Sequence, residues 1–96
     1  MLKSEFKENL IKIIKNRLPT CRIYLYGSRA RGDHSMGSDV DLALDAGQKI
    51  EPLTMIFIKE DIENSTIPYF VDVVDVHTIS ADFKQEITKE FVLLSE

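Results

Sequence analysis

The chain has 96 residues, a length that fits one folded domain over residues 1–96 rather than two. Its formal net charge of −4 argues against a broad basic surface for a long nucleic acid, although a mononucleotide needs only local positive charge. No apolar run approaches the ~18 residues of a membrane span, and charged residues interrupt the N-terminal segment where a secretory signal would need an apolar core. We therefore expect a cytoplasmic domain without membrane contact.

Hydrophobic spacing and turn residues predict alternating helices and strands. Apolar residues recur at helical spacing in the first and last of these segments, and Pro19 is a suitable stop for the first. The predicted elements are a helix over 4–18, a strand over 22–26, a short helix over 28–31, a loop over 32–37, a strand over 38–44, a helix from 52 to about 62, a strand over 69–76 and a helix over 80–94. This order predicts an α+β sandwich in which helices cover one face of a small sheet and the other face stays open to substrate.

A turn is expected where the strand over 22–26 runs directly into Gly27 and Ser28. Gly27 would let a phosphate approach the backbone closely, and the unpaired N–H groups of such a turn favour an anion. Arg29 and Arg31 follow, and their guanidinium groups could neutralise phosphates or form surface salt bridges. An ordinary strand-to-helix turn is the alternative explanation of the Gly-Ser pair.

The strand over 38–44 carries Asp39 and Asp41 two residues apart, so their side chains share one face with Cα atoms ~7 Å apart. Val40 and Leu42 alternate with them and supply the core face. Carboxylates this close repel each other unless a cation lies between them, and such hard oxygen ligands suit Mg²⁺. The alternative is the solvated face of a half-buried strand.

Two further acids, Asp72 and Asp75, lie in the most β-prone segment of the chain, residues 69–76. An acidic side chain in so apolar a strand is costly unless something compensates for its burial. Residues three apart face opposite sides of a regular strand, so the two acids should not enter the same site. The residues alone leave the choice between them open, and the acid outside the site, Asp75 for example, could simply lie at the solvated end of the strand.

The remaining thiol and imidazole groups do not indicate a metal site. Cys21 is the single cysteine, so it cannot form an intramolecular disulfide, and we expect it to be a small buried side chain. His34 and His77 lack metal-ligand spacing to a second histidine or cysteine. We expect His34 to be solvated and His77 to be a strand-end residue.

The combination of Gly27-Ser28, a ten-residue spacer, Asp39-x-Asp41 and a later single acid in a strand resembles the DNA polymerase beta-like nucleotidyltransferase superfamily. The form Gly-Ser-Arg-Ala-Arg-Gly and the short chain resemble the minimal nucleotidyltransferases, or MNT proteins. These are often the antitoxin halves of HEPN–MNT toxin–antitoxin pairs. The resemblance implies the polymerase beta-like fold with a small mixed sheet, and its motif register favours Asp72 over Asp75 as the third acid.

The resemblance also implies a site, cofactors and a reaction. It implies ATP as the substrate, two Mg²⁺ ions, and transfer of AMP to a hydroxyl of a partner protein, a HEPN toxin tyrosine. The implied metal-binding and catalytic residues are Asp39, Asp41 and Asp72, and the implied nucleotide-binding residues are Gly27, Ser28, Arg29 and Arg31. Two alternatives stay open, namely an antitoxin-like module that only masks its partner and an enzyme that modifies a small-molecule hydroxyl. The base specificity and the homo- or hetero-oligomeric state also stay open.

Overall fold

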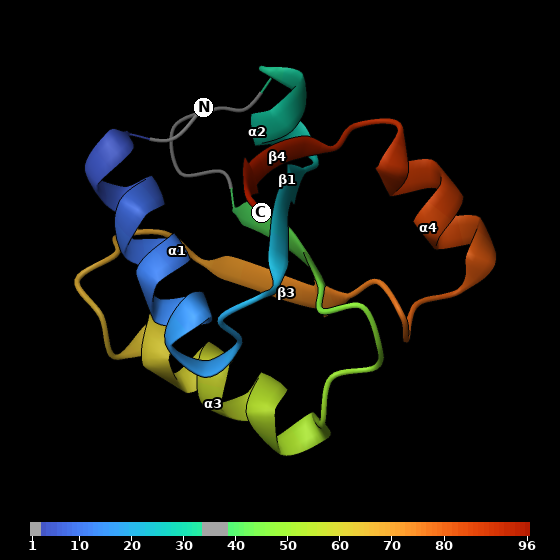
Figure 1. Cartoon of the computed structure of the whole chain (residues 1–96). Coiled ribbons are helices and arrows are strands. Elements are labelled where there is room, and N and C mark those ends of the chain that lie inside the picture. The colour runs from blue at the N-terminus through green and yellow to red at the C-terminus, as the bar shows by residue number, and fades with distance from the viewer. Residues whose placement is uncertain (1–2, 34–38) are drawn as a thin grey trace.

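Within residues 3–33 and 39–96, the part of the chain that the computed structural model describes, a four-stranded sheet forms the centre of the molecule (Figure 1). The strands are β1 (Arg22–Tyr26), β2 (Val40–Asp45), β3 (Val71–Asp75) and β4 (Val92–Ser95). They lie in the order β3-β2-β1-β4. β1 pairs antiparallel with β2 and β4, whereas β2 and β3 run parallel, so the sheet is mixed, as expected.

Helices lie on both sides of this sheet, but more of them lie on one side than on the other. They are α1 (Ser4–Arg17), α2 (Ser28–Arg31), α3 (Pro52–Glu63) and α4 (Ala81–Thr88). Figure 1 shows α1 and α3 together on one side of the sheet, α2 at the end of β1, and α4 on the opposite side. The Ser80 hydroxyl accepts the Phe83 N–H at 3.1 Å and so caps the N-terminus of α4.

The main core fills the space between the sheet and the pair α1 and α3. Its fully buried large side chains include Leu10, Ile14, Ile23, Leu25, Val40, Leu42, Leu44, Ile58 and Val73. Each such side chain contributes about 1.5–3 kcal/mol by leaving water. A second and smaller cluster on the other face joins Ile87 of α4 to Tyr26, Ala43 and Val76. The face expected to be open is therefore shared between this cluster and the acidic residues.

The prediction of a continuous helix over residues 80–94 is wrong in its second half. The helix α4 ends at Thr88, and Val92–Ser95 forms β4 instead. The physical reason lies in the free edge of β1, whose backbone groups need partners that an apolar segment can supply as a strand. Phe91 packs against this edge, because its ring stacks on Tyr24 with 4.5 Å between centroids.

β2 begins at Val40, and Ser38 and His34 lie outside the described residues. His77 follows β3, as expected for a strand-end residue, and its Nε2 lies 2.9 Å from Asp45 Oδ1. No helix in the described part of the chain is long and apolar enough to cross a membrane.

Cys21 is fully buried in the main core, as expected, and this burial raises the pKa of its thiol to about 11. The reactive thiolate is therefore about one in a thousand molecules at pH 8. We expect a thiol reagent to leave folded protein unlabelled at pH 8, to react faster as the pH rises toward 11, and to label it completely in denaturant. Rapid labelling of the folded protein at pH 8 would contradict this burial.

Candidate active site

Asp41 and Asp72 lie side by side on neighbouring parallel strands. The register of β2 and β3 pairs these two residues directly. Their neighbours Leu42 and Val73 are buried in the main core, so alternation along each strand turns both carboxylates to the other face. Asp72 is exposed, Asp41 is half-buried, and exposed Asp39 immediately precedes β2. The predicted acids thus gather at one end of the second face of the sheet.

This grouping of acids is electrostatically costly. Burial raises the pKa of Asp41, and the negative charges of Asp72, Asp39 and Glu90 raise it further. In the described part of the chain, no basic side chain forms an ion pair with Asp39, Asp41 or Asp72. Unpaired carboxylate oxygens are the donors that a hard divalent cation such as Mg²⁺ prefers.

The carboxylate oxygens of Asp41 and Asp72 are chemically suitable ligands for Mg²⁺. Residues 3–33 and 39–96 contain no group of three or more acidic, histidine or cysteine side chains placed so that it could hold a metal ion. Mg²⁺, however, usually takes only one or two carboxylates and completes its coordination with water and substrate phosphates. The pair Asp41 and Asp72 meets that requirement once a nucleotide supplies the remaining oxygens.

The turn at Gly27 lies close to Asp41 of this group. Gly27 joins β1 to α2 with φ of 78°, a left-handed conformation that favours glycine. A Cβ atom at this position would collide with the Asp41 carboxylate. The Gly27 carbonyl accepts the N–H groups of Ala30 and Arg31 at 3.1 and 3.0 Å and so begins α2, where Ser28 is the first residue. The backbone at Gly27 therefore lies directly against the Asp41 carboxylate.

The two arginines of α2 have different surroundings. Arg29 is only 4 % exposed, and its guanidinium lies over the ring of Tyr69, 4.4 Å from the centroid. Tyr69 in turn packs edge-on against Phe6 of α1. Arg29 therefore connects α2 to the side of the sheet that carries α1.

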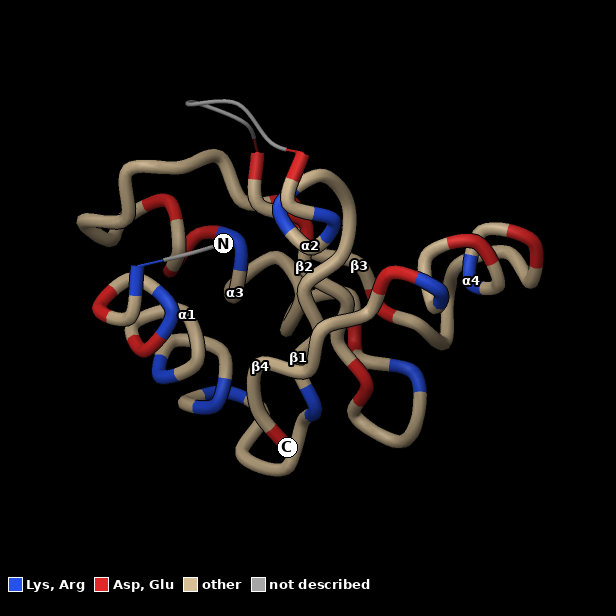
Figure 2. The backbone as a smooth tube through the Cα atoms, turned by 90° about the horizontal axis from the view of Figure 1, so that it is seen from above, with Lys and Arg blue, Asp and Glu red and all other residues tan. Residues whose placement is uncertain are grey.

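Arg31 instead forms ion pairs with two other acidic residues. Its guanidinium binds Glu90 through Nη1 at 2.9 Å and Asp33 through Nε at 3.1 Å, and its charge opposes the increase in the pKa of Asp41. Figure 2 shows basic positions on α2 with acidic positions around them. The sequence alone does not indicate a role for Glu90, because a helix continuing to residue 94 would not bring its side chain to this turn.

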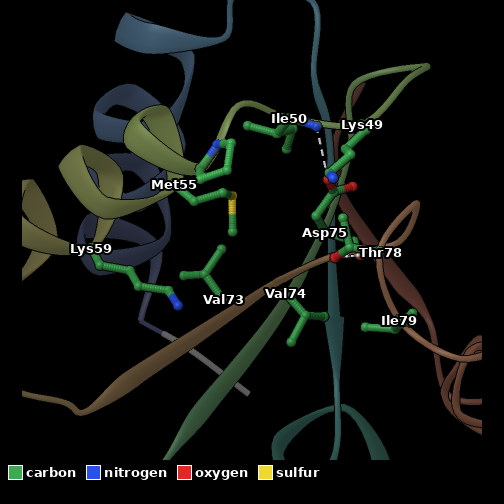
Figure 3. A pocket seen from close by; sticks show the side chains of 10 residues that line it. Lys49, Ile50, Met55, Lys59, Val73, Val74, Asp75, Thr78 and Ile79 are labelled. Atoms are coloured by element: carbon green, nitrogen blue, oxygen red, sulfur yellow. Dashed lines mark hydrogen bonds between the residues drawn. The ribbon is translucent and has the colours of Figure 1, made fainter.

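Asp75 belongs to a different environment from Asp72. It is 3 % exposed and faces the α3 side of the sheet. Its Oδ2 accepts the Ile50 N–H at 2.8 Å (Figure 3). Its Oδ1 accepts the His77 N–H at 2.9 Å. The pocket beside it, of about 350 Å³, is lined mainly by apolar side chains and two lysines. The expected opposite orientation of the two acids is confirmed, but the suggestion that Asp75 lies at a solvated strand end is wrong.

Comparison with known proteins identifies relatives of the whole chain. The profile of the family described as "Polymerase beta, Nucleotidyltransferase" matches residues 8–96. The probable protein adenylyltransferase MntA of Haemophilus influenzae is 32% identical over 95 residues, which span 99% of this chain and 83% of that protein.

Solved structures share the fold. A crystal structure of a toxin–antitoxin with AMP-PNP matches with a TM-score of 0.79 and 24% identity, over 93% of this chain and 72% of that one. A tri-AMPylated Shewanella oneidensis HEPN toxin in complex with MNT antitoxin matches with a TM-score of 0.76 and 21% identity, over 98% and 72% of the two chains.

The two environments on β3 predict that removing the charge of Asp75 lowers stability, whereas removing that of Asp72 changes it little. The Asp75→Asn variant loses one of two acceptors for buried N–H groups, so we expect a destabilisation of about 1–3 kcal/mol. The Asp72→Asn variant removes only an exposed, repelled charge, so its free energy of unfolding should change by less than ~0.5 kcal/mol. Thermal and urea unfolding of both variants measure this difference, and equal destabilisation would contradict the assigned environments.

The turn predicts that Gly27→Ala is more harmful than the same change at another left-handed glycine. Gly47 has φ of 82° and no atom near the position of an added Cβ, so Gly47→Ala tests backbone strain alone. Gly27→Ala adds the collision with Asp41, and we expect it to cost at least about 1 kcal/mol more than Gly47→Ala. Combining Gly27→Ala with Asp41→Ala should restore part of the loss. Identical unfolding curves for the two alanine variants would exclude a close approach.

Proposed function

Because this chain belongs to the polymerase beta nucleotidyltransferase family, as one of its minimal nucleotidyltransferases, we propose that it transfers AMP from ATP to a tyrosine hydroxyl of a HEPN toxin and so acts as an antitoxin. The observation that carries this proposal is the direct pairing of Asp41 and Asp72 beside the Gly27 turn. The adenylyltransferase name of the Haemophilus influenzae relative and the AMPylated toxin bound to an MNT antitoxin support the choice of reaction and acceptor.

We assign the three carboxylates different roles, some in nucleotide binding and one in activating the acceptor. Asp39 and Asp41 would hold Mg²⁺ where the triphosphate binds, and Asp72 would help to hold a metal ion on the acceptor side. When bound, Mg²⁺ supplies positive charge that stabilises the leaving pyrophosphate and lowers the pKa of the attacking hydroxyl. Exposed Asp72 suits the acceptor side, because a partner protein must bring its tyrosine to this face from outside.

The Gly27 turn and α2 bind the phosphates. Gly27 and Ser28 bring the backbone close to them, without a side chain at the first position that would exclude them. We assign the direct phosphate contact to Arg31, because its charge acts on Asp41 whereas Arg29 lies against Tyr69. Arg29 then supports the site by fixing the orientation of α2.

The reaction forms a bond between the tyrosine oxygen and the α-phosphorus and breaks the bond from that phosphorus to the bridging oxygen. Pyrophosphate leaves, and the phenolic proton passes to solvent. A tyrosine with pKa ≈ 10 is mostly protonated at neutral pH, so the site must favour its ionised form. The added phosphate puts negative charge on the toxin, and that charge would repel the phosphates of its RNA substrate.

The enzymatic proposal predicts a lasting change in the toxin. After brief incubation with this protein, ATP and Mg²⁺, we expect the separated toxin to carry AMP by mass spectrometry and to stay inactive as a ribonuclease. Incubation without ATP is the control and should leave a toxin that recovers its activity. Full recovery of an unmodified toxin after incubation with ATP would establish masking, the alternative function, in place of transfer.

Variants of the acids should separate nucleotide binding from turnover. The double variant Asp39→Asn/Asp41→Asn should lose Mg²⁺-dependent ATP binding in calorimetry, because it removes ligand charge where the ion and the triphosphate meet. Asp72→Asn should retain much of the ATP affinity but release pyrophosphate at least ~100-fold more slowly.

The matched control is Asp45→Asn on the same face of β2. Hydrogen bonds from the Gly47 N–H and from His77 keep the pKa of Asp45 below its ordinary value, so this acid already has partners away from the site. Asp45→Asn should therefore bind ATP and release pyrophosphate like the wild type. Normal ATP binding by the double variant would exclude the proposed metal and nucleotide site.

A further inference from the structure

We propose that Glu90 is a positioning residue of the nucleotide site, which holds the Gly27 turn and aims the Arg31 guanidinium at the β- and γ-phosphates of ATP. This inference rests on the proposed function, because it assigns a role within the same site.

One carboxylate bridges two separate parts of the site. Glu90 Oε2 accepts the backbone N–H of Gly27 at 2.8 Å, and Glu90 Oε1 accepts Nη1 of Arg31 at 2.9 Å. The Glu90 side chain is 22% exposed, so this is a partly desolvated, charge-assisted contact rather than a fully solvated surface pair. Its two oxygens therefore fix the position of the turn relative to the guanidinium that follows it.

The backbone of Glu90 is itself held on both sides. Its N–H binds the Ile87 carbonyl at 2.9 Å, as α4 ends. The following residue, Phe91, stacks on Tyr24, and Val92 then pairs with Leu25 of β1. A carboxylate between a helix end and a sheet edge is well placed to orient another group, because little of its freedom remains to be lost.

Arg31 needs such an orienting partner. Its side chain is 46% exposed, and its other acidic partner, Asp33, lies only two residues along the chain and is itself 62% exposed. Without Glu90, the guanidinium could follow Asp33 into solvent. Glu90 also adds negative charge near Asp41, an electrostatic cost that a site tolerates when the group has a role there.

The decisive experiment compares MgATP with AMP as ligands of the full-length Glu90→Gln variant. The amide keeps the size of the side chain and one acceptor oxygen, but it loses the ion pair with Arg31. We expect the Kd for MgATP to rise about tenfold and the Kd for AMP, which lacks the β- and γ-phosphates, to change less than about twofold. In an Arg31→Met background, Glu90→Gln should have no further effect on MgATP, because the two residues act as one unit.

Two further variants keep the test specific. Glu86→Gln, at an exposed position of α4, removes the same charge four residues earlier in the chain and should bind both ligands like the wild type. Glu90→Asp keeps the charge but is too short to bridge both partners, and it should weaken MgATP binding without affecting AMP. It also provides the measurement if Glu90→Gln does not fold.

Different results would reject the role of Glu90 and the proposed function of the protein. Unchanged or tighter MgATP binding by both Glu90 variants would overturn the inference, and tighter binding would mean that Glu90 competes with phosphate. Equal losses for MgATP and AMP, or additive effects with Arg31→Met, would also overturn it by assigning Glu90 a purely structural role. Failure of the wild type to bind MgATP would instead reject the proposed function itself.

Discussion

The direct pairing of Asp41 with Asp72 across parallel strands is the constraint on which the site depends. Like charges at neighbouring positions destabilise a sheet, so other forces must fix this register. The main core does so, because Leu42 and Val73 pack under α1 and α3 on the opposite face. A slip of one residue along either strand would turn its acid into the core and its apolar neighbours into water. Hydrophobic packing on one face therefore fixes the charge pattern on the other.

Segments distant in sequence from β2 and β3 contribute the other residues of the candidate site. The turn at Gly27 can lie against Asp41 only because it has no Cβ, and Glu90 reaches that turn from 63 residues away. The last strand therefore contributes to the site as well as to the fold, since β4 covers the edge of β1 and fixes the chain that follows Glu90. The C-terminal segment is thus part of the site's support, and a change there should affect ligand binding as well as folding.

Local periodicity explains how much of this arrangement could be predicted from the sequence. Alternation with a period of two predicted the opposite orientation of Asp72 and Asp75, because it depends only on the strand itself. The shared face of Asp39 and Asp41 stays a prediction, since Asp39 lies just outside β2. The end of α4 could not be predicted in this way. Residues 91–94 satisfy a helical stripe as well as a strand, and the free edge of β1 decides between them. The different surroundings of Arg29 and Arg31 likewise depend on distant partners.

Asp72 and Asp75 show how one strand can carry both a structural and a functional acid. Asp75 is buried, and backbone N–H groups satisfy both of its oxygens, so its charge contributes to the fold. Asp72 is exposed, has no basic partner in the described residues, and adds to the repulsion felt by Asp41. A cationic ligand bound beside Asp41 and Asp72 would relieve the repulsion between them. The uncompensated charge of Asp72, rather than its sequence position alone, is therefore the stronger reason to place it in the site.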